Sequence, residues 1–334
     1  MLEKNKKRLL ILRFSALGDV TMIAPVLNEL LLQNPNVEIY VASRPFMETI
    51  FKQFPQINFI PVDLNKQYKG FFSLFSLYKE LKKYKFDYVA DLHNVIRSKI
   101  ITFLFKIDGT KTATLDKGRA EKKALVSQEN KTLQQLKLTT ERYADVLRNL
   151  SFQLTLSHQL KSFVKKEEKS IGIAAFAAFS SKMYPLEKMK IIAKKLANDG
   201  YTVYLFGGGQ SEIIELKSWE NLNPNIKSLA GVISFDDELQ HIAKLELMIS
   251  MDSANMHLAS LMGTRTISIW GGTHPYAGFL GYGQSMEDVI QDNNLTCRPT
   301  SIFGKNPENF KNFDYFQNLS ADYVYQEIKK RLEK

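Results

Sequence analysis

The sequence is poor in cysteine and has no long uninterrupted run of apolar residues. Cys297 is the single cysteine in 334 residues, which excludes an internal disulfide and fits a reducing compartment. The apolar segment 9–12 is interrupted by Arg13, too early for the core of a signal peptide. The longest mostly apolar segments, such as residues 100–105, are far shorter than the ~20 residues that a membrane-spanning helix needs. We therefore expect a cytoplasmic protein.

The sequence also lacks the residue patterns of several common enzyme classes. The five histidines show no metal-ligand spacing, and no Asp-x-Asp pair follows a predicted strand. The chain has neither the Gly-x-Ser-x-Gly elbow of serine hydrolases nor the three-glycine fingerprint of dinucleotide-binding domains. We therefore expect no metal ion and no nicotinamide or flavin cofactor.

Positive charge is concentrated in the first half of the chain. Residues 1–160 contain 25 lysines and arginines against 15 acidic residues, whereas residues 161–334 contain 20 of each. This asymmetry indicates an anionic partner, although lysines that only keep the surface soluble would give the same count. The sequence carries no recognisable nucleic-acid-binding module, and we do not expect nucleic acid to be that partner.

Short apolar runs alternate along the chain with longer amphipathic segments, which is typical of parallel βαβ units. We predict strands at residues 9–13, 37–42, 59–62, 88–92, 113–115, 171–176, 201–206, 247–251 and 266–270. Helices are predicted at residues 20–33, 45–53, 71–83, 95–105 and 185–198. A charged segment at 151–169 divides the pattern, which predicts two doubly wound, Rossmann-like α/β domains (1–160 and 161–334) facing a central cleft. A last helix, capped by Ser320, either stays in the second domain or returns to the first.

Doubly wound sheets bind ligands beyond the carboxyl ends of their strands, so the loops at those ends are the candidate sites. The loop 14–19 ends with Asp19 at the start of a helix, where a carboxylate either caps the helix or acts as a general base. Lys182 precedes the helix 185–198, although a helix N-terminus favours an anion. Lys182 is therefore either an ordinary surface lysine or one side of a phosphate site.

Two further loops could approach a ligand with their backbone. Gly208 and Gly209 follow the strand 201–206, where glycines permit close approach to a ligand or simply form a tight turn. Asp252, Ser253, Ala254 and His257 follow the strand 247–251 and begin a helix, whose free N–H groups would suit a diphosphate.

Together these loops resemble glycosyltransferase family 9, the ADP-heptose:lipopolysaccharide heptosyltransferases, which have the GT-B fold. The resemblance rests on residues 13–20, 91–98, 182–187 and 252–259, and above all on their order and spacing. It implies an inverting, metal-independent transfer of heptose from ADP-heptose to a lipopolysaccharide core acceptor.

The resemblance also implies roles for individual residues. Asp19 matches the catalytic base and Lys182 the lysine that binds the diphosphate. The donor site would further include Ser180, Ser181, Gly208, Gly209, Asp252, Ser253, Ala254 and His257. The acceptor side would include Ser15, Gly18, Asn94, Arg97 and Arg119.

The implied acceptor is a lipid-linked saccharide on the cytoplasmic face of the inner membrane. An anionic leaflet would hold the protein there peripherally through the densest basic group of the first half. This group consists of Lys111, Lys117, Arg119, Lys122 and Lys123. We expect the protein to be a monomer.

The sequence departs from the family pattern just before Lys182. Ala177 and Ala178 replace the small or hydroxylated residues that would contact the diphosphate, and Ser180 and Ser181 are the possible substitutes. The segment 297–300 keeps one cysteine of a region that is often richer in cysteine. Two alternatives therefore stay open: a GT-B transferase that uses another donor such as a UDP-hexose, and a nucleotide-sugar-binding protein without turnover. The presence of both Asp19 and Lys182 argues against the second.

Overall fold

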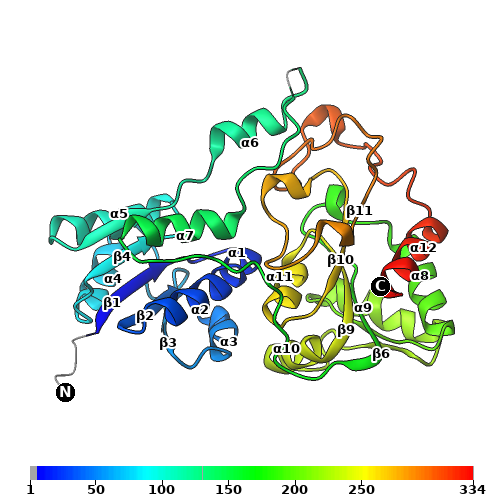
Figure 1. The fold of residues 1–334 in the computed structure, drawn as a ribbon, viewed down its shortest axis with the longest axis horizontal. Helices are drawn as coiled ribbons and strands as arrows, with labels where there is room; N and C mark the ends of the chain where they lie inside the picture. Colours follow the sequence, from blue (N-terminus) through cyan, green and yellow to red (C-terminus); the bar gives the residue numbers. More distant parts are fainter. Residues whose placement is uncertain (1–5, 130, 334) are drawn as a thin grey trace. The chain divides into compact units, whose positions relative to one another are not determined.

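The computed structural model describes residues 6–129 and 131–333 and divides the chain into two compact α/β units (Figure 1). The first unit comprises Met1–Arg119 and Thr139–Ser157, and the second comprises Ala120–Leu138 and His158–Lys334. The prediction of two Rossmann-like parallel-sheet domains is confirmed. The chain passes between the units at three places, and the segment Ala120–Leu138 belongs to the second unit. The single boundary expected from the sequence at residue 160 does not include these crossings.

The first unit contains a five-stranded parallel sheet in the order β3-β2-β1-β4-β5. Its strands are β1 (Lys7–Leu12), β2 (Val37–Ser43), β3 (Ile57–Pro61), β4 (Tyr88–Asp91) and β5 (Lys111–Thr114). The central strand β1 is almost entirely apolar, and its residues from Leu9 to Leu12 are fully buried. Such a continuous apolar run is typical of a parallel strand that is covered by helices on both faces.

Two pairs of helices pack within the first unit. Helices α4 and α5 lie side by side and share a core with Leu10 and Leu12 of β1, while α2 and α7 contact each other. The helices are α1 (Leu17–Thr21), α2 (Ile23–Gln33), α3 (Glu48–Lys52), α4 (Ser73–Lys82), α5 (Ile96–Ile107) and α7 (Thr139–Asn149), with a 3-10 turn at Pro45–Met47. The single helix predicted at residues 20–33 is divided at Met22, and α7 was not predicted.

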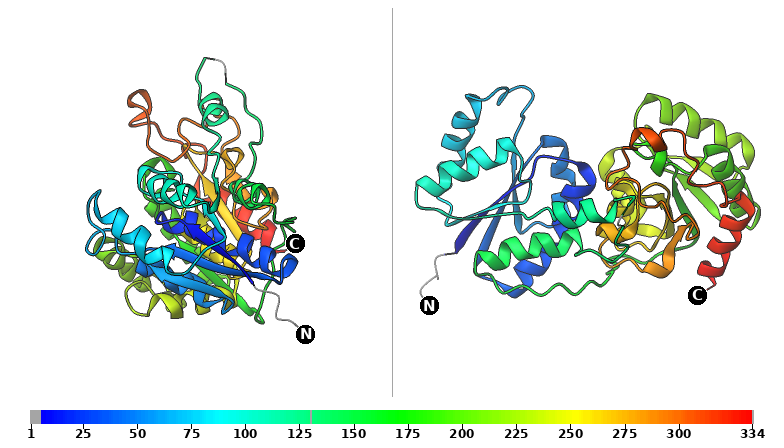
Figure 2. Two further views of the ribbon diagram at one scale, coloured as in Figure 1. Left: turned by 90° about the vertical axis from the view of Figure 1, so that its left-hand side faces the viewer. Right: turned by 90° about the horizontal axis from the view of Figure 1, so that it is seen from above.

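The second unit contains a six-stranded parallel sheet in the order β11-β10-β9-β6-β7-β8. Figure 2 shows the ribbon of this unit from two further sides. Its strands are β6 (Glu167–Ala174), β7 (Thr202–Leu205), β8 (Ile226–Ser228), β9 (Leu245–Met251), β10 (Thr266–Trp270) and β11 (Val289–Gln291). The predicted strand 266–270 is reproduced residue for residue. The two central strands β6 and β9 pair directly, from Ile171 opposite Leu247 to Ala174 opposite Ser250.

The helices of the second unit are α6 (Arg119–Leu125, all but its first residue in this unit), α8 (Leu186–Asn198), α9 (Gln210–Trp219), α10 (Phe235–Lys244), α11 (Ala254–Leu261) and α12 (Ala321–Leu332). Residues of α8, α9 and α12 share a core with Trp219 and Tyr184. Short 3-10 turns lie at Ser180–Lys182, Glu220–Leu222, Pro275–Ala277, Met286–Asp288 and Glu308–Phe310.

The last helix, α12, packs within the second unit. Ser320 caps it as predicted, because its hydroxyl oxygen accepts a hydrogen bond from the backbone N–H of Tyr323 at 3.1 Å. Val324 and Ile328 are fully buried in the same core as α8. None of the helices in the described part of the chain combines the length and the apolarity needed to cross a bilayer.

Each sheet has a switch point, where chain connections leave two neighbouring strands in opposite directions. This point lies between β1 and β4 in the first unit and between β6 and β9 in the second. Ligands of open α/β sheets bind beyond the strand ends at such points. Asp19 follows β1 and Lys182 follows β6, so both predicted catalytic residues lie at switch points.

Candidate active site

In the first unit, a buried arginine holds the carboxylate of Asp19. The Nη2 atom of Arg13 lies 2.7 Å from Oδ2 of Asp19, and the Arg13 side chain is only 8% exposed. Two backbone carbonyls fix the rest of the guanidinium, since Nε donates to Ser15 at 2.8 Å and Nη1 donates to Leu92 at 2.6 Å. A charge this deeply buried is stable only when its donors are satisfied, as they are here.

Asp19 uses only one of its two carboxylate oxygens, Oδ2, in its contacts with the protein. The backbone N–H of Ala16 also reaches Oδ2, at 3.4 Å, and the carboxylate side chain is 30% exposed. Tyr143, from α7, lies beneath this pair, with the Arg13 guanidinium 5.7 Å from its ring centre. Both contacts of the carboxylate fall on Oδ2, so Oδ1 is the oxygen that could accept a proton from a substrate hydroxyl.

A neutral histidine lies beside this loop. Burial, together with the nearby charges of Arg13 and Lys117, lowers the pKa of His93 to about 4. The backbone N–H of Phe14 points at Nδ1 of His93, and Oγ of Ser15 lies near Nε2, each at 3.4 Å. The ring is therefore uncharged at neutral pH and contributes a dipole, not a charge, to the site.

The loop after β4 is organised by Asp91, which is completely buried. Its Oδ1 accepts hydrogen bonds from the backbone N–H groups of His93 and Asn94 at 2.9 and 2.8 Å, and its Oδ2 accepts from the Ser98 hydroxyl at 3.0 Å. Burial raises the pKa of Asp91, and these hydrogen bonds oppose that rise. Asn94 donates from Nδ2 to the carbonyl of Leu115 at 2.6 Å, which ties this loop to the one after β5.

Several basic side chains gather near this end of the sheet. Lys117 is half-buried, and burial, together with the charges of Arg13 and Arg119, lowers its pKa. Arg97, in the first turn of α5, and Arg119, at the start of α6, are both exposed. Ser15 lies in the β1–α1 loop and Gly18 in the first turn of α1, and both are partly exposed. A partner that carries negative charge would relieve the crowding of positive charge here.

The basic group expected to face a membrane is divided between the two units. Lys111 lies at the start of β5, where its ammonium donates to the Ser151 hydroxyl, whereas Lys117 follows the end of that strand. Lys122 belongs to the second unit and is buried, with its Nζ atom 4.5 Å from the ring centre of Phe279. Lys122 is therefore not available to a membrane surface, and Lys111 and Lys117 lie at opposite ends of β5.

In the second unit, Lys182 and Asp252 form a buried ion pair at the switch point. The Nζ atom of Lys182 lies 3.0 Å from Oδ2 of Asp252, and the two side chains are 14% and 6% exposed. The Thr273 hydroxyl donates to the same oxygen at 2.8 Å. Lysine has three N–H donors, so the ammonium can bind a phosphate oxygen while Asp252 holds it in position.

The turn that carries Lys182 is fastened to two neighbouring loops. The backbone N–H of Gly272 donates to the Ser181 carbonyl at 2.7 Å, and the Ser181 hydroxyl donates to the Gly304 carbonyl at 2.5 Å. A Cβ atom on Gly271 would lie 2.2 Å from the Ser181 carbonyl oxygen, so only glycine fits there. Ser181 is thus committed to holding the turn, whereas Ser180 is exposed.

The other predicted donor residues lie in two helix N-termini. The backbone N–H of Gly208 donates to Oε2 of Glu212 at 2.8 Å, and Gly209 begins α9 with a φ of +97°, a conformation that favours glycine. Ser253 and Ala254 begin α11, and the Ser253 hydroxyl lies 3.2 Å from that of Ser250 instead of capping the helix. His257 follows one turn later and is 7% exposed.

A buried arginine supports the loop after β10. Arg298 is 3% exposed and donates to the carbonyl of Thr273 at 2.8 Å, to that of Asp292 at 3.0 Å, and to that of Gly271. Burial lowers the pKa of Arg298 to about 10. Lys131 donates to the carbonyls of Cys297 and Pro299, which attaches the Ala120–Leu138 segment to this region.

The sequence reasoning missed the residues that hold Asp19 and Lys182 in place. Arg13, Thr273, Arg298 and Lys131 are each buried or half-buried and bonded to the loops described above. Arg13 belongs to the motif 13–20 and Arg298 to the segment 297–300, but the sequence pattern gave neither residue a role. Among residues 6–129 and 131–333, no group of three or more His, Cys, Asp or Glu side chains is arranged to hold a metal ion.

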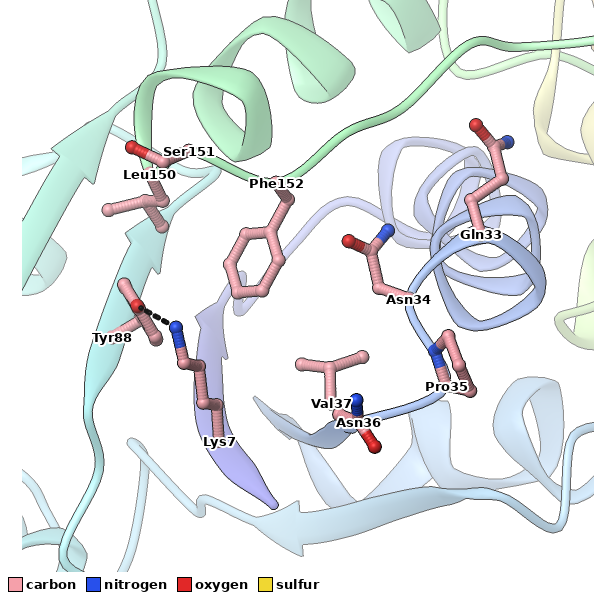
Figure 3. A pocket seen from close by; sticks show the side chains of 10 residues that line it. All are labelled: Lys7, Gln33, Asn34, Pro35, Asn36, Val37, Tyr88, Leu150, Ser151 and Phe152. Atoms are coloured by element: carbon pink, nitrogen blue, oxygen red, sulfur yellow. Dashed lines mark hydrogen bonds between the residues drawn. The ribbon is translucent and has the colours of Figure 1, made fainter. Parts of the chain in front are cut away.

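A separate hollow in the first unit lies away from these loops (Figure 3). Its lining includes Lys7, Asn34, Tyr88 and Phe152. Lys7 and Tyr88 are the first residues of β1 and β4, so the hollow lies at the amino ends of the strands. Ligands of doubly wound sheets bind at the carboxyl ends, and we assign this hollow no part in the reaction.

Curated proteins similar to this chain are heptosyltransferases. Lipopolysaccharide heptosyltransferase 1 of Campylobacter coli is 25% identical over 296 residues, which cover 80% of this chain and 85% of that protein. Lipooligosaccharide heptosyltransferase 2 of Campylobacter jejuni is 23% identical over 321 residues, which cover 94% and 96%.

Solved structures of such enzymes share the fold. A glycosyltransferase family 9 protein from Veillonella parvula has a TM-score of 0.73 at 19% identity, covering 99% of both chains. The E. coli heptosyltransferase WaaC with ADP has a TM-score of 0.70 at 18% identity, covering 97% of this chain and 99% of that one. The GT-B fold expected from the sequence is thus confirmed.

The family model of glycosyltransferase family 9 (heptosyltransferase) matches residues 74–301. This match is more than half of the chain and contains Lys182 and Asp252, while Asp19 lies before its start. The chain therefore belongs to glycosyltransferase family 9 and is a glycosyltransferase.

Proposed function

We propose that this enzyme transfers a heptose from ADP-heptose to a lipopolysaccharide core acceptor, with inversion at the anomeric carbon and without a metal ion. The observation that carries the proposal is the pair of buried charge arrangements at the two switch points, Arg13 with Asp19 and Lys182 with Asp252. One presents a carboxylate oxygen and the other an ammonium, and a displacement of diphosphate by a hydroxyl needs both. The names of the curated relatives support the choice of heptose.

In the proposed reaction, Oδ1 of Asp19 takes the proton of an acceptor hydroxyl while that oxygen forms a bond to the anomeric carbon. The bond between this carbon and the diphosphate oxygen breaks at the same time, and ADP leaves with the electron pair. General-base assistance of this kind contributes roughly 10²–10⁴-fold to the rate. A single displacement inverts the configuration of the anomeric carbon.

Lys182 stabilises the negative charge that grows on the leaving diphosphate. Asp252 and the Thr273 hydroxyl keep its Nζ atom in place before the donor binds. The N–H groups at the start of α11 add a positive dipole end beside the same carboxylate. Lys182 and the N–H groups of α11 would together stabilise the negative charge on the leaving diphosphate.

The acceptor that we propose is a lipid-linked saccharide that carries negative charge. Lys117, Arg119 and Arg97 would attract it, since they are the basic groups near the carboxyl ends of β4 and β5. The enzyme would then act in the cytoplasm, bound peripherally to the inner face of the inner membrane.

A donor panel tests this proposal. The purified enzyme is incubated with a heptose-free lipopolysaccharide acceptor and with ADP-heptose, UDP-glucose or UDP-galactose, and products are measured by mass spectrometry. We expect a one-heptose mass increase with ADP-heptose alone. Transfer from a UDP-hexose at a higher kcat/KM would show that the donor sugar is a hexose and not a heptose. The absence of transfer from any donor would contradict the assignment of Asp19 and Lys182 to catalysis.

A further inference from the structure

Helix α5 is apolar on two opposite sides. Its buried side faces the core of the first unit with Ile101 and Phe105, which are 0% and 2% exposed. Ile96, Phe103 and Ile107 are 76%, 61% and 66% exposed and, with the partly buried Ile100, follow at intervals of four, three and four residues. These intervals place the four side chains in one stripe along the outward side of the helix. Ile100 packs partly against the core of the unit, whereas Ile96, Phe103 and Ile107 form an exposed apolar stripe that this core does not cover.

Aromatic side chains at the start of α4 are exposed in the same region. Phe71, Phe72 and Phe75 are 66%, 89% and 50% exposed. Helix α4 packs directly beside α5 (Figure 1). The rings of Tyr78 and Phe105 are 5.1 Å apart, and the Tyr78 hydroxyl is bonded to Asp108. Since both helices cover one face of the sheet, their outward sides belong to the same side of the unit.

Lysines flank these apolar side chains. Lys99 and Lys106 are exposed and seven residues apart, so they form a row beside the stripe on α5. The Nζ atom of Lys79 lies 4.9 Å from the ring centre of Phe75. Residues 69–107 contain eight lysines and arginines against three acidic residues, one of which, Asp91, is completely buried. The surface is therefore both apolar and positively charged.

We propose that this surface docks the first unit onto an anionic lipid bilayer. The docking surface consists of Phe71, Phe72, Phe75, Ile96, Phe103 and Ile107, with Lys79, Lys99 and Lys106 as its basic residues. The apolar side chains enter the boundary between headgroups and acyl chains, and the lysines extend to the lipid phosphates. Apolar stripes flanked by cations match this boundary, where an anionic headgroup layer covers hydrocarbon.

The same charges disfavour a second copy of the chain as the occupant. A symmetric dimer through this surface would bring the lysines of the two copies together, and like charges at an interface are destabilising. The docking surface rests on the proposed function in one respect, because a lipid-linked acceptor requires the enzyme to reach a membrane.

Sedimentation with vesicles tests the docking surface without any need for catalysis. Vesicles of phosphatidylethanolamine and phosphatidylglycerol are compared with vesicles of phosphatidylcholine, and the bound fraction is measured at low and high salt. We expect binding to the anionic vesicles only. The double variant Phe103→Ser/Ile107→Ser should bind at least tenfold more weakly, and Lys99→Gln/Lys106→Gln should lose about fivefold for each lysine.

Matched variants on the second unit serve as controls. Ile214 is 62% exposed and Lys194 is exposed, and we expect Ile214→Ser and Lys194→Gln to bind vesicles like the unmodified enzyme. Undiminished binding by the Phe103→Ser/Ile107→Ser variant, or failure of the unmodified enzyme to bind anionic vesicles, would overturn the docking surface. Transfer to a delipidated, water-soluble acceptor is assayed in parallel. Vesicle binding without any such transfer would contradict the proposed function and leave the docking surface standing.

Discussion

The Nη2 atom of Arg13 lies 2.7 Å from Oδ2 of Asp19, and the guanidinium is held from behind by the carbonyls of Ser15 and Leu92. The arginine thus fixes the position of the carboxylate in the first turn of α1. Because the contact falls on Oδ2, the other oxygen can accept a proton. We regard Arg13 as a positioning residue that acts through Asp19.

Replacing Arg13 should lower turnover without weakening donor binding. Arg13→Met leaves the carboxylate unanchored, and a misplacement of about 1 Å costs up to roughly a hundredfold in rate. We expect kcat to fall roughly tenfold to a hundredfold, a partial recovery in Arg13→Lys, and an ADP dissociation constant within about twofold of the original.

Arg8 provides the matched control for this prediction. It lies near the opposite end of the same strand and pairs with Glu38 at 3.1 Å. Arg8→Met should leave kcat unchanged. Equal losses of kcat in the Arg8 and Arg13 variants would indicate a general effect on the fold and remove the positioning role.

Replacing Lys182 should weaken the binding of ADP. Lys182→Met removes a charged hydrogen-bond donor, worth about 1.5–3 kcal/mol, which corresponds to roughly a tenfold to hundredfold higher dissociation constant. Calorimetric titration with ADP measures the change, and Lys194→Met is the control. An unchanged affinity would show that the ammonium does not contact the diphosphate.

A methyl group at Gly271 should disrupt the turn that carries Lys182. The added Cβ atom would lie 2.2 Å from the Ser181 carbonyl oxygen and 2.4 Å from the Phe316 ring. We expect Gly271→Ala to lower the free energy of unfolding by about 1–3 kcal/mol, measured by urea denaturation, and to weaken ADP binding. At Gly208 the same methyl group would meet no atom of the described residues within 4 Å, so Gly208→Ala should leave the free energy of unfolding unchanged. Equal stability of the two variants would contradict the close packing at Gly271.

The buried histidine beside Asp19 should make the first unit sensitive to acid. The pKa of His93 is about 4 in the folded chain and 6.5 ordinarily, so between these values only the unfolded chain takes up the proton. The free energy of unfolding should therefore fall as the pH drops from 6.5 towards 4, by about 1–3 kcal/mol for this residue.

Urea denaturation of His93→Gln at pH 7 and pH 5 measures this contribution. We expect the variant to lose less stability between the two pH values than the original protein does. His158→Gln is the control, since it exchanges a histidine in the second unit. An identical pH dependence for His93→Gln and the original protein would rule out the buried, neutral ring.

The sequence predicted the central strands of both sheets because they are continuous apolar runs, whereas the short edge strands β8 and β11 were not predicted. Segments such as Leu9–Leu12 and Thr266–Trp270 are buried on both sides of the sheet. Such strands can be predicted from their own residues, without knowledge of contacts to distant parts of the chain. Helix α7 was missed because its segment is largely polar. Among its buried residues, Tyr143, Ala144, Val146 and Leu147 form the apolar side, and the others are polar.

Contacts between distant parts of the chain were beyond the reach of the sequence pattern. The segment Ala120–Leu138 follows the first sheet, yet Lys131 bonds to the backbone near Cys297 and Leu125 packs beside Ala277. Asp19 and Lys182 could be selected because each follows a strand at a helix start. Arg13 and Thr273 could not, since their partners depend on how the loops fold.

Single-turnover kinetics of Asp19→Asn test the central claim most directly. The amide keeps the size of the side chain but cannot take the acceptor proton. We predict a fall in the rate of sugar transfer of roughly 10²–10⁴-fold, with ADP affinity within about twofold and with Asp236→Asn behaving like the original enzyme. Transfer by Asp19→Asn at the original rate would show that this carboxylate is not the base.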